Sequence, residues 1–125
     1  MSAKSYTFQN GESCQGVGIE TAGGNTLDVI TIYGSYPDDE YWARNLEARE
    51  TVVVATGIGE LALRGSDVVA LDARGLQGAQ AVVVEPGGWF RWHSTDGMVI
   101  AMECEPGFDA EKYEIKSEQE LRNEI

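Results

Sequence analysis

The sequence has little basic charge and no long hydrophobic run, and each shortage excludes a class of function. Acidic residues outnumber lysine and arginine by 21 to 9 in 125 residues, which gives a formal net charge of -12. A surface of this sign repels phosphate backbones and anionic lipids, so we expect no nucleic-acid or membrane partner. The apolar runs are far shorter than the ~20 residues that a spanning helix needs. The opening residues, MSAKSYTFQNGES, lack the apolar centre of a signal peptide, so the expected location is the cytoplasm.

Cysteine and histidine are also scarce. Cys14, Cys104 and the single histidine, His93, are too few to indicate a zinc cluster. In a reducing compartment we expect two free, partly buried thiols, although two cysteines also allow one bridge. No serine lies in a nucleophile elbow, so the sequence does not indicate a nucleophilic triad.

What the chain does contain is 15 glycines set between short runs rich in β-branched and aromatic residues. This pattern predicts a single all-β domain over residues 1–125, a sandwich or barrel of short strands. We expect strands in LDVITIYGSY, ETVVVATGIGELALRG, DVVALDARG, QAVVVEPGGWFRW and GMVIAMECE. Within the second of these, TVVVATGIGELAL predicts a strand, a glycine-containing turn and a returning strand, and RGSD predicts the next hairpin.

Helix signals are confined to the last residues. Asp109 is placed to cap a turn, and Glu118 lies four residues before Arg122, the spacing of an ion pair on a helix. The apolar stripe around Tyr113 is weak. We therefore expect a short docked segment around Tyr113, followed by a frayed polar end.

The stretch VVVEPGGWFRWHS contains the only histidine and two of the three tryptophans. Pro86 cannot donate to a strand ladder and the next two residues are glycines, so we expect two strands joined by a turn at Pro86 to Gly88. Strand alternation places Trp89, Arg91 and His93 on one face of the second strand and Phe90, Trp92 and Ser94 on the other.

Three features resemble the cupin family. Glu50 followed by TVVVAT and Gly57 matches the end of the first cupin motif, Pro86 to Gly88 matches the opening of the second, and ECEPGFDAEKYE is similar to the end of many small cupins. The resemblance extends from about Leu27 to Tyr113. It implies a double-stranded β-helix barrel with a core at about 27–108 and a short helical or irregular tail at 109–125.

The metal-binding histidines of that family are missing. Their positions fall on other residue types: Arg44 and Leu46, or Ala43 and Asn45 with the longer spacing, and Arg91 in the second motif. The resemblance therefore implies no standard metal site. It places Glu50, Arg91 and His93 inside the barrel, with Arg44 as a further candidate.

Each of these side chains has two interpretations. The Arg91 guanidinium either binds a carboxylate or phosphate of a ligand or pairs internally with Glu50. His93 is either a hydrogen-bonded wall residue or a weak metal ligand. Trp89 and Trp92 suit a flat or sugar-like ligand, or they fill the core and a dimer contact.

Three functions remain. The first is binding of a small anionic or sugar-like metabolite, without a cofactor, by Arg91, His93, Glu50, Arg44, Trp89 and Trp92. The second is a metal-dependent cupin enzyme, an isomerase, lyase or oxygenase, in which Glu50 and His93 are catalytic or bind a divalent metal together with Glu103. The third is a non-catalytic structural or dimerisation module. A homodimer is expected because small cupins are commonly dimers and an exposed edge strand favours pairing.

Overall fold

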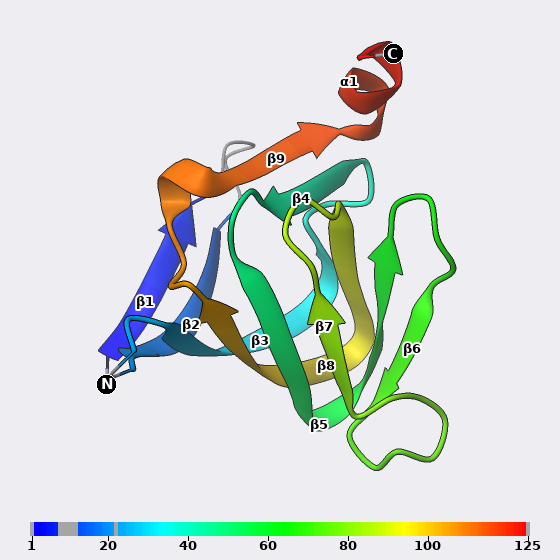
Figure 1. Cartoon of the computed structure of the whole chain (residues 1–125). Coiled ribbons are helices and arrows are strands. Elements are labelled where there is room, and N and C mark those ends of the chain that lie inside the picture. The colour runs from blue at the N-terminus through cyan, green and yellow to red at the C-terminus, as the bar shows by residue number, and fades with distance from the viewer. Residues whose placement is uncertain (1, 8–12, 22, 125) are drawn as a thin grey trace.

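The structure, a computed structural model, describes residues 2–7, 13–21 and 23–124. In this part of the chain, nine strands form one antiparallel sheet that curls into a barrel (Figure 1). The strands are β1 (Ser2–Thr7), β2 (Ser13–Glu20), β3 (Thr26–Tyr36), β4 (Tyr41–Asn45), β5 (Arg49–Leu63), β6 (Val69–Asp72), β7 (Ala81–Val84), β8 (Phe90–Glu105) and β9 (Tyr113–Ser117). The prediction of an all-β domain is confirmed.

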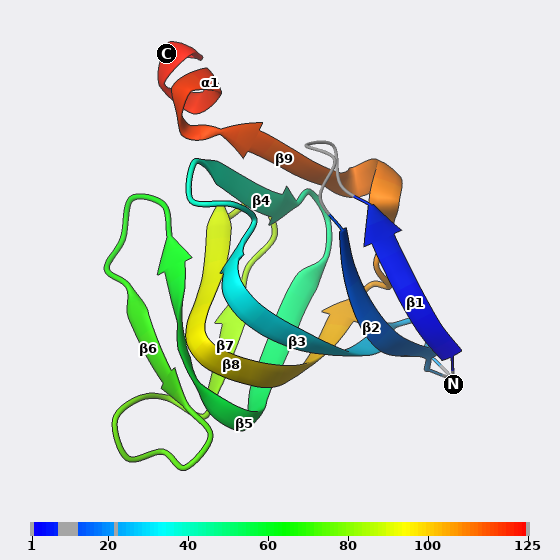
Figure 2. The same ribbon diagram turned by 180° about the vertical axis from the view of Figure 1, so that it is seen from behind.

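The longest strand, β8, organises the barrel. It pairs with β3 along one edge and with β5 along the other, and both β5 and β8 bend sharply so that they run through both halves of the barrel (Figures 1 and 2). The β1–β2 hairpin extends the sheet from β3, while β6 and β7 extend it from β5. The turn at Pro86 to Gly88 joins β7 to β8 as expected, but these two strands are not neighbours, because both pair with β5.

The expected hairpin within TVVVATGIGELAL is wrong. The whole stretch lies in β5, which stays continuous and changes register twice against β8, around Thr56 and between Gly57 and Glu60. A Cβ on Gly57 would lie 2.3 Å from the Gly97 carbonyl oxygen, and φ at Gly57 is +83°. The glycines therefore allow a bulge and a close approach of two strands rather than a chain reversal.

The C-terminal segment packs across one end of the barrel, where β9 pairs with β4 (Figure 1). It begins with a 3₁₀ helix, η1 (Ala110–Lys112), whose N-cap Asp109 accepts a hydrogen bond from the Glu111 amide. It ends with α1 (Glu118–Asn123), in which Arg122 lies 3.4 Å from Glu118. Tyr113 is buried, so the expected docked segment is confirmed. None of the described helices is long and apolar enough to cross a membrane.

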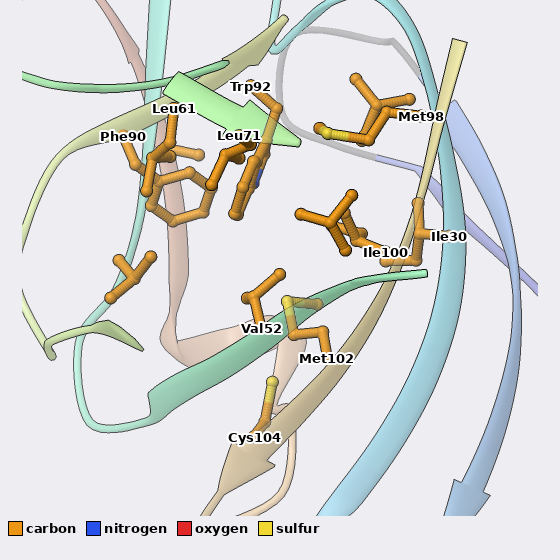
Figure 3. Packing of buried hydrophobic residues seen from close by; sticks show 14 of the residues in the cluster. Ile30, Val52, Leu61, Leu71, Phe90, Trp92, Met98, Ile100, Met102 and Cys104 are labelled. Atoms are coloured by element: carbon orange, nitrogen blue, oxygen red, sulfur yellow. The ribbon is translucent and has the colours of Figure 1, made fainter. Parts of the chain in front are cut away.

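The core lies inside the barrel and is built from alternate residues of the bent strands. On β8 these are the even-numbered residues, from Phe90 and Trp92 in the first half to Ile100, Met102 and Cys104 in the second (Figure 3). Burying each large apolar side chain of this kind contributes about 1.5–3 kcal/mol. The even-numbered face of β8 thus stabilises the barrel, and the odd-numbered face points outward.

Candidate functional site

The barrel encloses a cavity of about 40 Å³ between β3, β5, β8 and the C-terminal segment. Its wall is mostly apolar, but two carboxylates, Asp28 and Glu50, also line it. Each is only 2% exposed. A buried polar atom without a partner is costly, and the Oε2 atom of Glu50 is one, so the cavity is the candidate site.

Glu50 extends inward from β5. Its Oε1 accepts a hydrogen bond from the side-chain amide of Asn45, while its Oε2 is buried without a hydrogen-bond partner. Burial raises the pKa of Glu50 to about 7, the Asn45 hydrogen bond opposes this rise, and the charge of Asp28 adds to it. At neutral pH both the acid and the carboxylate of Glu50 are therefore populated, which suits a group that exchanges protons.

Asp28 reaches the same cavity from β3, where it lies opposite Met102 of β8. Glu50 lies opposite Cys104 on the other side of β8, so the two carboxylates come from strands that flank the same neighbour. The sequence analysis missed Asp28. Its signal is nevertheless present: in LDVITI, Asp28 falls in the same alternation phase as Ile30 and Ile32, both buried.

Aromatic side chains form much of the remaining wall. They are Tyr36, Phe90, Trp92, Phe108 and Tyr113. The hydroxyl groups of Tyr36 and Tyr113 are 2.9 Å apart and hydrogen-bonded. Phe90 and Phe108 each pack edge-on against Tyr113, so the C-terminal segment and the turn before it each supply one ring of the cavity wall. This arrangement of flat apolar surfaces beside carboxylates and hydroxyl groups suits a small ligand with a ring and polar substituents.

Cys104 lies beside the two carboxylates and is fully buried as a free thiol. Burial, and next the charge of Glu50, raise its pKa to about 12. A thiol in this state is not nucleophilic at neutral pH. The side chain of Cys14 lies outside the described part of the structure.

The prediction that Arg91 and His93 point into the barrel with Glu50 is wrong. The strand alternates as expected, but Phe90, Trp92 and Ser94 take the inner face. Arg91 stacks on the Trp42 ring, 4.2 Å from its centroid, and donates to the Asp39 and Tyr41 carbonyls. The Nδ1 atom of His93 lies 2.8 Å from the Ser35 hydroxyl, and His93 lines a hollow separate from the cavity, together with Glu60 and Ser94. Arg91 is therefore neither the internal partner of Glu50 nor part of the cavity.

Arg44 and Trp89, also expected near the interior, form a second pair on the outer face. The Arg44 guanidinium lies 4.4 Å from the centroid of the Trp89 ring and donates to the Glu114 carboxylate. Arg44 alternates with Ala43 and Asn45, which point inward from β4, so its outward direction follows from the strand period. Of the six expected ligand-binding residues, Glu50 and Trp92 line the cavity.

The alternative metal ligands do not converge. Glu50 points into the barrel, whereas His93 and Glu103 occupy odd-numbered, outward positions of β8. Among the residues that the structure describes, no group of three or more histidine, cysteine, aspartate or glutamate side chains could hold a metal ion. The donor set of the cavity, two carboxylates without an imidazole, does not fit the histidine-rich metal site of the cupin family.

Comparison with solved structures defines the class of the fold. Over 92% of this chain and 85% of the other, the structure is similar to Pac13 from Streptomyces, described as a unique nucleoside dehydratase, with a TM-score of 0.67 and 14% identity. A cupin-2 domain from Rhodospirillum rubrum matches over 98% of this chain and 79% of the other, with a TM-score of 0.67 and 12% identity. A cupin-2 protein from Shewanella frigidimarina matches over 70% and 76%, with a TM-score of 0.58 and 14% identity.

These neighbours show that the fold is the double-stranded β-helix of cupin-like domains, as the sequence motifs suggested. No protein-family model matches the chain, and no curated protein matches it in sequence. The likeness therefore rests on structure, and it leaves the chemistry of the site to be argued from the residues of this chain.

Proposed function

We propose that the protein binds a small, uncharged, hydroxyl-bearing molecule, such as a nucleoside, in the barrel cavity, and that Glu50 exchanges a proton with it. The observation that carries this proposal is the Oε2 atom of Glu50, which is buried without a hydrogen-bond partner in a residue that lines the cavity. A buried oxygen of this kind costs free energy unless a ligand group pairs with it.

The charge of the cavity favours one of the two ligand classes expected from the sequence. Among the wall residues that the structure describes, the two acidic side chains are those of Asp28 and Glu50, none is basic, and Arg91 lies on the outer face. Two carboxylates repel an anionic ligand, and they accept hydrogen bonds from sugar hydroxyl groups. The sugar-like ligand is therefore favoured over the anionic one.

The aromatic wall and the structural neighbour both favour a nucleoside. A planar base packs well between rings such as Phe90, Trp92 and Phe108. Variants of Pac13 in which one tyrosine or one histidine is replaced have been solved with uridine. A volume of about 40 Å³ holds only part of such a molecule, so we expect the rings of Phe108 and Tyr113 to move outward on binding.

Titration of the protein with uridine at pH 7, followed by calorimetry and by amide NMR shifts, tests this function. We expect shifts around β3, β5 and β8, and binding weakened about tenfold or more in Glu50→Gln. Glu60→Gln is the matched control, because Glu60 is an exposed carboxylate on the same strand.

Uridine 5′-monophosphate supplies the second arm of the experiment. The proposal expects it to bind more weakly than uridine, because its phosphate meets the two carboxylates. Tighter binding of the monophosphate would point to the outer arginines instead. Equal effects of the Glu50 and Glu60 substitutions, or no response to uridine, would refute the proposal.

A further inference from the structure

The carboxyl group of Glu50 accepts a hydrogen bond from one side chain, that of Asn45. Asn45 is the last residue of β4, is 4% exposed, and donates from its side-chain amide to Oε1 of Glu50. The chain turns between the two residues, so the end of β4 and the start of β5 together fix the orientation of the carboxyl group.

Asn45 and Glu50 border different pockets. Asn45 lines a second pocket of about 170 Å³, together with Ala48, Pro106 and Gly107 among others. Glu50 does not line this second pocket, and Asn45 does not line the cavity. The Asn45 amide thus closes one side of the carboxyl group and leaves the cavity side to the ligand.

The hydrogen bond determines which oxygen carries the proton. An amide N–H can only donate, so Oε1 must act as an acceptor whether Glu50 is neutral or charged. The proton of the neutral acid therefore resides on Oε2. When Oε2–H gives its proton to a ligand oxygen, the electron pair of the broken O–H bond stays on the carboxylate, and the Asn45 N–H stabilises the charge that remains.

We propose that Asn45 is the positioning residue of the site: by donating to Oε1, it makes Oε2 the single oxygen through which Glu50 exchanges a proton with a bound nucleoside-like ligand. This inference rests on the proposed function. It adds a specific role for a residue that touches the carboxyl group and not the ligand.

The other groups that face Glu50 do not replace this donor. Asp28 of β3 is a carboxylate, and Cys104 of β8 is a protonated thiol. The Tyr36 and Tyr113 hydroxyl groups, which also border the cavity, are bonded to each other. Removing the Asn45 amide should therefore leave the charged form of Glu50 less stabilised.

The test measures Glu50 directly, without a ligand. In protein labelled at the glutamate carboxyl carbons, NMR titration gives the pKa of Glu50, and the infrared C=O band of its neutral form reports the hydrogen bond to Oε1. We expect Asn45→Ala to raise the pKa by about one unit and to shift the infrared band upward. Asn45→Ser, which keeps a donor, should restore part of both changes, and it is the second variant if Asn45→Ala does not fold.

Asn123→Ala, an exposed asparagine of α1, is the matched control and should change neither value. The pH profile of uridine binding should move with the pKa of Glu50 in the Asn45 variants. An unchanged Glu50 pKa and infrared band in Asn45→Ala would overturn the positioning role, whatever uridine does. A shifted pKa in a protein that binds no uridine would instead overturn the proposed function, and with it the ligand part of this inference.

Discussion

The inside and the outside of the barrel show how differently the same fold treats charge. Inside, Glu50 accepts a hydrogen bond from the Asn45 amide, pairs with no cation among the described residues, and burial raises its pKa to about 7. Outside, Glu118 receives three hydrogen bonds from the Arg64 guanidinium, and this pairing lowers its pKa. The pKa of a glutamate is thus shifted in opposite directions at the two sites. Burial penalises the charge of Glu50, whereas the Arg64 guanidinium stabilises the charge of Glu118.

The two faces of the barrel also differ in how their polar side chains are paired. The outer face pairs arginine with tryptophan and carboxylate side chains, as in Arg91 on Trp42 and Arg44 on Trp89. Both arginines find their partners within the protein, whereas the buried Nε1 atom of Trp42 has no hydrogen-bond partner. On the inner face, the unpaired atom is a carboxylate oxygen, Oε2 of Glu50, in a residue that lines the cavity, and this is why we propose a ligand there.

The largest expected effect compares adjacent residues on β8. Trp92→Ala should destabilise the protein by about 3–5 kcal/mol, because it leaves a cavity in the core where Trp92 is 2% exposed. Arg91→Ala should cost only about 1 kcal/mol, since it removes a partly exposed cation–π contact and hydrogen bonds to carbonyls that water can reach.

Urea unfolding of the two variants at pH 7 measures this difference. Similar losses of unfolding free energy in the two variants would contradict the placement of Trp92 in the core and Arg91 on the outer face. A loss of several kcal/mol for Arg91→Ala alone would restore an internal ion pair with Glu50.

The next effect concerns the pH dependence of stability. The Glu50 pKa is raised from 4.5 to about 7, so the folded state holds this proton more tightly than the unfolded state. Its contribution to stability is therefore complete below pH 4.5 and is lost as the pH rises through about 7. The loss amounts to about 3 kcal/mol above that pH.

Glu50→Gln cannot ionise and should remove this part of the pH dependence. Unfolding free energies at pH 5 and pH 8 should differ less in the variant than in the parent protein. Glu60→Gln should leave the difference unchanged. If the parent protein and Glu50→Gln showed the same difference in unfolding free energy between pH 5 and pH 8, the raised pKa of Glu50 would be contradicted.

Much of the fold could be predicted from the sequence, but the phase of β8 could not be assigned from WFRWHS alone. Both faces of that stretch carry aromatic rings, so either could have been the inner one. The answer lies further along the strand, where Met98, Ile100, Met102 and Cys104 continue the phase of Phe90 and Trp92. When 90–105 is taken as two separate strands, the alternation of the second half no longer indicates which face of the first half is buried.

The candidate site was predictable in part for a related reason. Glu50 stands in a regular run with Val52 and Val54, and its inward direction follows from that alternation. Asn45 comes before a change of direction at 46–48, which breaks the alternation between β4 and β5. Its contact with Glu50 therefore depends on the turn, and spacing along the chain could not show it.

The smallest expected effect tests the outer face by salt. Arg44 is bound to Glu114 of β9 at 2.8 Å and stacks on Trp89, so it joins the C-terminal segment to the barrel wall. Arg44→Gln should lower the free energy of unfolding by about 0.5–1 kcal/mol at low ionic strength. At 1 M salt, where the screening length is about 3 Å, the ion-pair part of this loss should largely disappear and the stacking part should remain. Urea unfolding at the two salt concentrations measures both.

Uridine binding should not change in Arg44→Gln, because Arg44 points away from the cavity. A variant that loses uridine binding while staying folded would show instead that the outer arginines reach the ligand, and the division of roles between the two faces would fail.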